Sequence, residues 1–330
     1  MNAVGAIGNL ITKYLPIWIL IGLGIALWIP DSLAGGSPYS LYVVMGLMLL
    51  MGITLTPKDI TSIAKKPVSI LIGTACHYTV MPLLAYGVAW LLNLGPELTI
   101  GLVLLGCVAS GSASNVMVYL AKGDLTLAVS LGLVSTFASI LLTPLLVQFL
   151  IGELVSISAS SMALDIAKMV VAPIAVGLLM KTFLPRLCEH IIPFVGPASG
   201  IALVFICSAN FAAGQSAFLA SGFIIIAAVL MHNLGGFTLG YLISRFTRRT
   251  EGATRAVTLE TGMQNGGVAI VLAQTYFDPI AVLPSAVSGA VHVFTGSTLA
   301  RFWAARTIEE EAPTTDASVV TNDEPELTRD

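Results

Sequence analysis

The sequence predicts an all-α membrane protein with ten transmembrane helices, and three observations lead to this prediction. First, 56% of the 330 residues are apolar and only 10% are charged, with a mean hydropathy of +0.92. A soluble chain of this length needs many more charged residues to cover its surface. Second, apolar runs long enough to cross about 30 Å of hydrocarbon recur along the chain. Third, basic residues occur only in alternate connections between these runs.

Pro, Gly and charged residues divide the apolar runs, and such residues end or interrupt helices. The predicted spans are 14–30, 39–56, 68–93, 97–121, 124–151, 161–183, 191–212, 219–244, 251–276 and 280–303. Lys13 precedes the first run, but no small-residue cleavage pattern follows near Trp28. We therefore interpret this run as a membrane span and not as a signal peptide.

The basic residues predict how the spans are oriented. The connections without Lys or Arg are 31–38, 94–96, 152–160, 213–218 and 277–279. The opposite segments carry Lys13, Lys58, Lys65, Lys66, Lys122, Lys181, Arg186, Arg245, Arg248, Arg249, Arg255, Arg301 and Arg306. Because basic connections stay in the cytoplasm, this alternation predicts a multi-pass protein of the cell (inner) membrane, with both termini in the cytoplasm and an even number of spans.

The last residues have a different composition. From Thr307 onward Arg329 is the only base, and the acids are Glu309, Glu310, Glu311, Asp316, Asp323, Glu324, Glu326 and Asp330. The formal charge of −3 for the whole chain therefore hides a net positive charge in residues 1–306. We expect a transporter-like membrane domain over 1–306 and a disordered acidic cytoplasmic tail over 307–330.

An internal repeat is a hypothesis from the span count. Ten spans divide into two groups of five, and a unit with an odd number of spans inserts the second time upside down. Leu15-Pro16-Ile17 in the first span is echoed by Ala172-Pro173-Ile174 in the sixth. These observations favour two inverted five-helix repeats, at about 14–151 and 161–303.

Two spans are interrupted by polar and Gly-rich segments. The breaks lie at 109–115 in the fourth span and 260–267 in the ninth, which are corresponding members of the two halves. Lipid cannot satisfy an unwound backbone, so the breaks must be buried in protein or line water. Close helix packing through small residues is one interpretation. The matched positions favour the other, a binding site for ions and an anion at the repeat interface.

Glu260 lies in the second break, and a carboxylate at this depth marks an ion or proton site. Gln264 follows one helical turn later and offers a carbonyl oxygen, so a hard cation such as Na⁺ would find oxygen ligands here. His77, His232 and His292 lie within other spans. For each histidine the alternative to direct function is a hydrogen-bonded packing role, and His77 could titrate near neutral pH.

Other classes of protein are not supported by the sequence. An enzyme needs a nucleophile with a base, or metal ligands, aimed at one cavity. The histidines are scattered, and no ligand spacing connects Cys76, Cys107, Cys188 and Cys207. A channel needs a continuous polar stripe, whereas these spans have focal breaks. The sequence therefore favours a carrier whose partners are a small solute and the lipid bilayer, with no nucleic acid and no obligate protein partner evident.

At the two breaks the sequence resembles the bile acid:sodium symporter family. The resemblance rests on 111–123 (GSASNVMVYLAKG) and 260–265 (ETGMQN), and it extends from about Leu15 to Ala304. Further matches are Tyr78, Met81-Pro82, Met231-His232-Asn233, Val291-His292 and Gly296-Ser297. The resemblance implies a panel domain and a core domain, with the fourth and ninth helices crossing at their breaks. It also implies transport of bile acids or of smaller acids such as pantoate, 2-ketopantoate, pyruvate and glycolate, typically coupled to two Na⁺ ions.

The resemblance also implies the roles of individual residues. One Na⁺ site corresponds to Ser114, Asn115 and Glu260. The other corresponds to Glu260, Gln264, the backbone at Thr261 and Met263, and His77 at the position of a further ligand. The positions that touch substrate correspond to Ser112 and Asn265, and His292 is a third candidate.

Four positions depart from the family pattern. The first Na⁺ site usually has two hydroxyls from the fifth helix, where this chain has Ala128 and Gly132. This loss should weaken the site unless water or Ser130 substitutes. His77 stands where the second site usually has a glutamine, and Val293 replaces an asparagine of the tenth helix. A protonated His77 beside Glu260 could replace the second ion.

The sequence thus predicts a symporter of small organic anions that is coupled to Na⁺. Pantoate, 2-ketopantoate or related keto and hydroxy acids are the favoured substrates, by likeness to bacterial pantoate and ketopantoate transporter-like members, and bile-acid-like anions are a further option. The alternative is a proton-coupled or uncoupled carrier of organic anions on the same fold. Which acid is carried, the ion stoichiometry and the oligomeric state do not follow from the sequence.

Overall fold

The computed structural model describes residues 11, 14–155 and 157–306, so Lys13 and the predicted acidic tail lie outside the described residues. The elements of the first half are α2 (Leu15–Trp28), α3 (Pro30–Ala34), η1 (Ser37–Tyr39), α4 (Ser40–Thr54), α5 (Pro57–Ile63), α6 (Pro67–Leu91), α7 (Pro96–Cys107), α8 (Ala113–Leu120) and α9 (Leu125–Ile151). Those of the second half are α10 (Ala159–Ile166), η2 (Ala167–Val171), α11 (Ala172–Phe183), α12 (Pro185–Ala213), α13 (Gln215–Phe246), α14 (Glu251–Gly262), α15 (Gly266–Tyr276), η3 (Pro279–Val282) and α16 (Leu283–Ala304).

Seven helices among the described residues are long and apolar enough to cross a membrane. They are Pro30–Thr54, Pro67–Leu91, Leu125–Ile151, Ala159–Phe183, Pro185–Ala213, Gln215–Phe246 and Pro279–Ala304. Three shorter apolar helices, α2, α7 and α15, supplement them. α7 has 12 residues, about 18 Å at 1.5 Å per residue, which is roughly half of a bilayer core. The prediction of an all-helical membrane protein is confirmed at this level.

In several places the helices begin at other residues than predicted or change their local geometry, because a proline or a helix cap lies there. The predicted connection at 31–38 contains the short helix α3, which begins at Pro30. α5 begins after Thr56, whose hydroxyl and backbone form a capping box with Asp59. The predicted span 161–183 contains the π-helical turn η2 just before Pro173. A proline inside a helix lacks an N–H and crowds the preceding turn, so the helix widens there.

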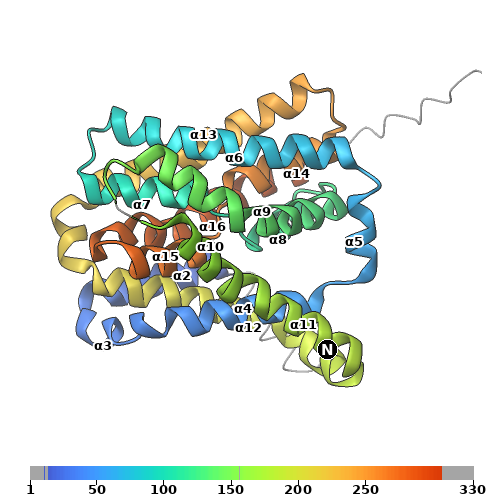
Figure 1. Cartoon of the computed structure of the whole chain (residues 1–330), viewed down its shortest axis with the longest axis horizontal. Helices are drawn as coiled ribbons and strands as arrows, with labels where there is room; N and C mark the ends of the chain where they lie inside the picture. The colour runs from blue at the N-terminus through green and yellow to red at the C-terminus, as the bar shows by residue number, and fades with distance from the viewer. Residues whose placement is uncertain (1–10, 12–13, 156, 307–330) are drawn as a thin grey trace, which may run out of the picture.

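The helices form layers around the site. Figure 1 shows α6, α13 and α14 on one side and α2, α3, α4 and α12 on the opposite side, with α15, α16, α8 and α9 between them. α2 packs against α12, α4 against α11, and α13 against both α6 and α14. The α4–α11 pair is close because Gly52 and Gly177 face backbone of the other helix, and a Cβ at either would collide with it. Small residues permit such close helix contacts in membranes.

The exterior carries large apolar side chains. Trp28 is 86% exposed and Phe223 is 89% exposed. In water such surfaces would be costly, whereas lipid accepts them, and tryptophans near helix ends suit the membrane interface.

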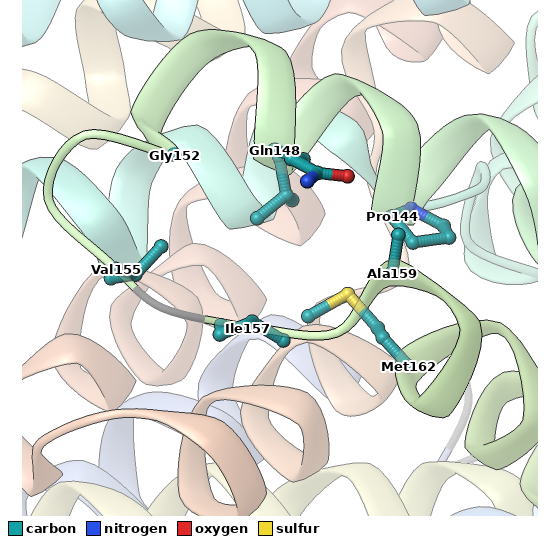
Figure 2. Close-up of a pocket in the computed structure, with 8 residues that line it drawn as sticks. Pro144, Gln148, Gly152, Val155, Ile157, Ala159 and Met162 are labelled. Carbon is teal, nitrogen blue, oxygen red and sulfur yellow. The ribbon is translucent and has the colours of Figure 1, made fainter.

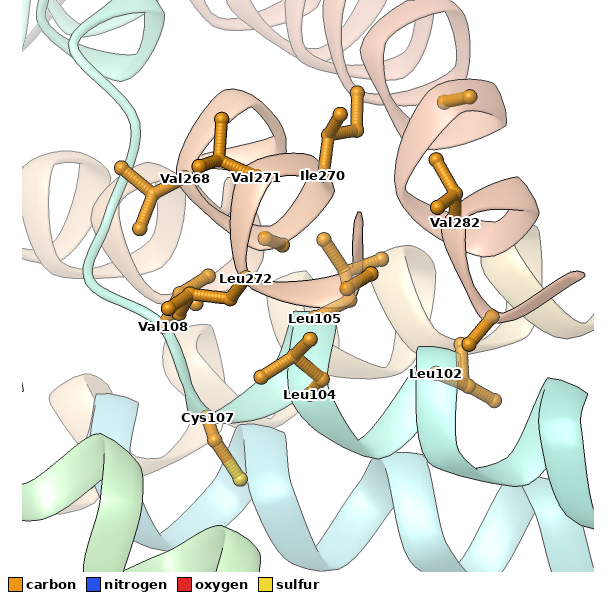
Figure 3. Close-up of a cluster of buried hydrophobic side chains, with 14 of the residues drawn as sticks. Leu102, Leu104, Leu105, Cys107, Val108, Val268, Ile270, Val271, Leu272 and Val282 are labelled. Carbon is orange, nitrogen blue, oxygen red and sulfur yellow. The ribbon is translucent and has the colours of Figure 1, made fainter. Parts of the chain in front are cut away.

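Two of the helices that flank the breaks, α7 and α15, share one apolar core. Leu104 and Leu105 of α7 and Leu272 of α15 are fully buried and belong to the same cluster (Figure 3). This packing holds α7, after which the first unwound segment begins, against α15, before which the second one ends.

Candidate functional site

The two unwound segments cross and pair with each other. The N–H of Gly111 donates to Met263 O at 2.9 Å, and the N–H of Asn265 donates to Ala109 O at 2.8 Å. These bonds form an isolated antiparallel bridge between Ser110 and Gln264. The structure therefore brings together the two breaks that the sequence analysis singled out.

Side chains from other helices satisfy carbonyls at the ends of α7 and α14. The hydroxyl of Thr143 in α9 donates to Cys107 O at 2.7 Å. The amide of Asn233 in α13 donates to Gly262 O at 2.7 Å. A helix end inside a membrane needs such partners because lipid offers none. The unwound backbone is thus stabilised by the surrounding helices.

His77 of α6 connects the two breaks. Its Nε2 lies 2.9 Å from Val108 O, and its Nδ1 lies 3.1 Å from Glu260 O. Both neighbours are carbonyl oxygens, which only accept hydrogen bonds. A neutral imidazole donates to one of them, whereas an imidazolium donates to both. His77 therefore contacts the backbone of the site, and its ring does not contact the Glu260 carboxylate.

The Glu260 carboxylate lies beside the crossing and is 3% exposed. Its Oε2 accepts from the Ser110 hydroxyl at 2.6 Å, and its Oε1 accepts from the Ser114 hydroxyl. Nearby, the side-chain oxygen of Asn115 is buried and has no hydrogen-bond partner among the described residues. A buried oxygen without a donor calls for an explanation, and amide and carboxylate oxygens are the kind of ligand that a hard cation takes.

Gln264 supplies a second group of oxygens. In one orientation of its side-chain amide, the oxygen faces Thr261 O and Met263 O. In the reversed orientation the amide nitrogen donates to the same two carbonyls, at 3.2 and 3.3 Å. The reversed orientation satisfies both carbonyls with hydrogen bonds, whereas the first places three oxygens close together.

Ser112 begins α8 and Asn265 begins α15, the half-helices that follow the two breaks. Asn265 caps α15, since its side-chain oxygen accepts from the N–H of Val268 at 3.2 Å. Ser112 begins α8, is exposed and makes no side-chain cap. Both line a small cavity of about 10 Å³. Its further lining residues come from α4, α8, α9 and the first unwound segment: Met48, Met51, Ser110, Gly111, Asn115, Gly132 and Thr136. The cavity has room for about one water molecule. In this conformation the space between the two half-helix N-termini and α4 is therefore too small for an organic anion.

His292 lies elsewhere. It is buried in α16 beside the backbone of Gln264, and the described residues that line the small cavity do not include it. The structure therefore places His292 behind the second break and does not bring it to Ser112 and Asn265.

The departures at α9 leave space beside Glu260. Gly132 faces the carboxylate, and a Cβ built on it would lie 3.6 Å from Oε2. Ala128 is fully buried and offers only a methyl group. The Ser130 hydroxyl donates to Thr126 O at 2.9 Å, so it bonds to its own helix and not to Glu260.

Two residues of the site were missed at the sequence level. Ser110 was visible only as part of the break, and its bond to Glu260 depends on the crossing. Asn233 was visible only as part of a matching motif, and its bond to Gly262 O depends on the packing of α13 against α14.

A larger cavity lies away from these residues. It holds about 360 Å³ between the end of α9 and the start of α10 (Figure 2). The described residues that line it are Gln148, which is polar, and Pro144, Val147, Gly152, Val155, Ile157, Ala159 and Met162. Pro144 is about 18 Å along α9 from Gly132. No charged side chain lines this cavity among the described residues, whereas the small cavity lies at the two crossing segments, so the small cavity is the candidate site.

A multi-pass helical protein with two unwound helices crossing beside a buried carboxylate belongs to the class of membrane transport proteins. Residues 41–221 match the model of the Sodium Bile acid symporter family. The chain belongs to this family, and it is a transporter and not an enzyme.

Curated relatives agree along almost the whole chain. An uncharacterized sodium-dependent transporter, YocS of Bacillus subtilis, is 32% identical over 94% of this chain and 97% of its own length. The probable chloroplastic sodium/metabolite cotransporter BASS1 of Arabidopsis thaliana is 32% identical over 90% of this chain and 75% of its own length. The corresponding BASS2 of Oryza sativa is 33% identical over 92% and 73%. Similarity to these proteins supports membrane transport that depends on sodium.

Proposed function

We propose that this protein is a secondary active symporter that moves a small organic anion together with Na⁺. The observation that carries the proposal is the Glu260 carboxylate, buried where the two unwound segments cross. Pantoate, 2-ketopantoate or related keto and hydroxy acids are candidate substrates, and bile-acid-like anions are a further one. The names of the curated relatives support Na⁺ as the coupling ion, but they do not indicate which acid is carried.

Two groups of oxygens fit Na⁺. The first comprises Glu260, Ser114 and Asn115, and the unpartnered oxygen of Asn115 supports it. The second comprises Glu260, the Gln264 side chain and the backbone at Thr261 and Met263. Carboxylate, hydroxyl, amide and carbonyl oxygens are suitable ligands for a hard cation.

The anion would bind at Ser112 and Asn265. Each begins a half-helix whose first N–H groups carry partial positive charge. A bound Na⁺ near Glu260 offsets the cost of bringing an anion to this depth, so each ligand raises the affinity for the other.

Alternating access follows if a panel domain moves against a core domain. In this proposal residues 1–306 form ten spans, arranged as two inverted repeats with both termini in the cytoplasm of the cell membrane. Polar contacts from Gln274 in α15 reach Asn210 at 2.6 Å and Ser37 at 2.5 Å, next to α12 and α4. In this proposal α15 belongs to one domain, and α4 and α12 belong to the other. These contacts lie near the predicted outer connections, so they would close the outer side.

Uptake into proteoliposomes tests the proposal. Uptake of a radiolabelled panel of small carboxylates should require an inward Na⁺ gradient and should fall to background in Glu260→Ala. Glu97→Ala is the matched control, because Glu97 is an exposed carboxylate in the first turn of α7. Normal coupled uptake by Glu260→Ala would contradict the assignment of the site.

A proton-coupled or uncoupled carrier is a second candidate because of His77. Its two ring nitrogens face two carbonyl oxygens, so a doubly protonated ring would be a fixed cation at the second site. Replacing Na⁺ by K⁺ at constant pH separates the candidates. Unchanged uptake would favour this second carrier.

A further inference from the structure

The neighbourhood of Glu260 contains more acceptor oxygens than protons to satisfy them. The Ser114 oxygen lies 2.7 Å from Gly111 O and also contacts Glu260 Oε1. One hydroxyl has one proton, so it cannot donate to both. The buried side-chain oxygen of Asn115 also lacks a partner among the described residues. A cation shared by these oxygens would remove the deficit.

The α9 face of this neighbourhood has an open position. A Cβ built on Gly132 would lie 3.6 Å from Glu260 Oε2, 3.8 Å from Ser110 Oγ and 3.9 Å from Asn115 Nδ2. These are ordinary contact distances, so a small side chain fits there. As the chain stands, α9 presents no hydroxyl from position 128 or 132 to the carboxylate.

Ser110 contacts the same carboxylate oxygen that Gly132 faces. Its hydroxyl lies 2.6 Å from Glu260 Oε2. Ser135 of α9 orients it, because the Ser135 oxygen lies 3.4 Å from the Ser110 N–H and 3.3 Å from the Ser110 hydroxyl. The Ser135 hydroxyl itself donates to Gly132 O at 3.0 Å. The Ser110 oxygen therefore keeps a lone pair free beside Glu260.

We propose that Ser110 is a ligand of the cation bound by Glu260, Ser114 and Asn115, and that it supplies from the unwound segment the hydroxyl that α9 lacks at Gly132. This inference rests on the proposed Na⁺ coupling and adds a ligand to it. It implies that positions 110 and 132 are interchangeable sources of one oxygen.

Sodium binding to the purified full-length protein tests the inference without transport. The midpoint of thermal unfolding is measured in detergent while Na⁺ replaces K⁺ at constant ionic strength. Ser110→Ala should raise the apparent Kd for Na⁺ about tenfold, or ~1.4 kcal/mol. The double variant Ser110→Ala/Gly132→Ser should recover the affinity to within about threefold. Ser139→Ala is the control, because this buried α9 hydroxyl donates to Thr136 O of its own helix.

The experiment distinguishes a failure of the role proposed for Ser110 from a failure of the proposed Na⁺ coupling. A Na⁺-dependent shift in the original protein that is unchanged in Ser110→Ala overturns the role of Ser110 alone. Weaker binding without recovery in the double variant also overturns it, because Ser110 then acts through the crossing and not as an interchangeable oxygen. The midpoint in K⁺ alone reports whether the variants fold. Absence of any Na⁺ response in the original protein overturns the proposed coupling and the inference together.

Discussion

At the scale of single residues, the site depends on how closely two backbones approach. Gly111 donates to Met263 O across the crossing, and a Cβ on Gly111 would lie 2.8 Å from Gln264 O. Real Cβ atoms do not come this near to a carbonyl oxygen, so any side chain at 111 must push the segments apart. A glycine is needed at 111 for space and not for an unusual backbone conformation, because no glycine among the described residues has a positive φ.

Gly111→Ala should therefore weaken the site. We expect a loss of about 1–3 kcal/mol in stability, as for other overpacked positions, and weaker Na⁺ binding. Gly24→Ala in α2 is the matched control, because a Cβ on Gly24 meets nothing within 4 Å. Thermal unfolding of both variants, with and without Na⁺, measures the difference. Equal stability of the two variants would show that the crossing tolerates a methyl group.

At the scale of helices, Arg255 holds three elements together. It is 1% exposed in α14, and its guanidinium donates to Ala121 O at the end of α8 and to Trp303 O near the end of α16, at 2.7 and 3.2 Å. Glu251 accepts from its Nε at 3.0 Å. A cation near helix C-termini is favourable because the last carbonyls carry partial negative charge. Arg255 thus connects α8 and α14, one half of each interrupted helix, to α16.

Arg255→Met should destabilise the protein by about 3–5 kcal/mol, since it leaves the buried carbonyls of α8 and α16 without their donor. Arg245→Met is the control. Arg245 also pairs with Glu251, at 3.6 Å, but its side chain is 55% exposed, and exposed pairs contribute about 0–1 kcal/mol. Thermal unfolding in detergent compares the two variants. A similar, small effect for both would contradict the role assigned to Arg255.

At the scale of the whole molecule, one polar cluster joins helices that pack in different parts of the structure. Gln274 of α15 donates to Ser37 and Asn210, and the Asn210 amide donates in turn to Ser40 of α4 at 2.7 Å. A second contact joins Tyr276 to Asp165 of α10 at 2.6 Å. Such contacts form or break as units, so they can bias a two-state movement of one domain against the other.

Gln274→Ala should shift the protein towards the conformation that is open on the outer side. The reporter is Ser112→Cys, at the exposed start of α8, in a chain whose four native cysteines are buried and free. A membrane-impermeant thiol reagent added outside should label it several times faster in Gln274→Ala. Gln215→Ala is the control, since the Gln215 amide donates to Leu27 O, at 3.3 Å in an exposed position away from this cluster. Equal labelling rates in both variants would contradict a closing role for the cluster.

The sequence by itself determined the helical membrane class, because burial in lipid requires long apolar runs, and it located both breaks, because Gly and polar residues such as Ser112 and Asn265 stand out in such runs. It also singled out Glu260, since a carboxylate at that depth needs a partner. Only the tertiary structure decided which atoms meet Glu260: Ser110 reaches it, His77 bonds to its backbone, and His292 lies behind the break. The periodicity of one helix specifies which residues share a face, whereas contacts between residues 150 positions apart, as for Ser110 and Glu260, depend on how separate helices pack.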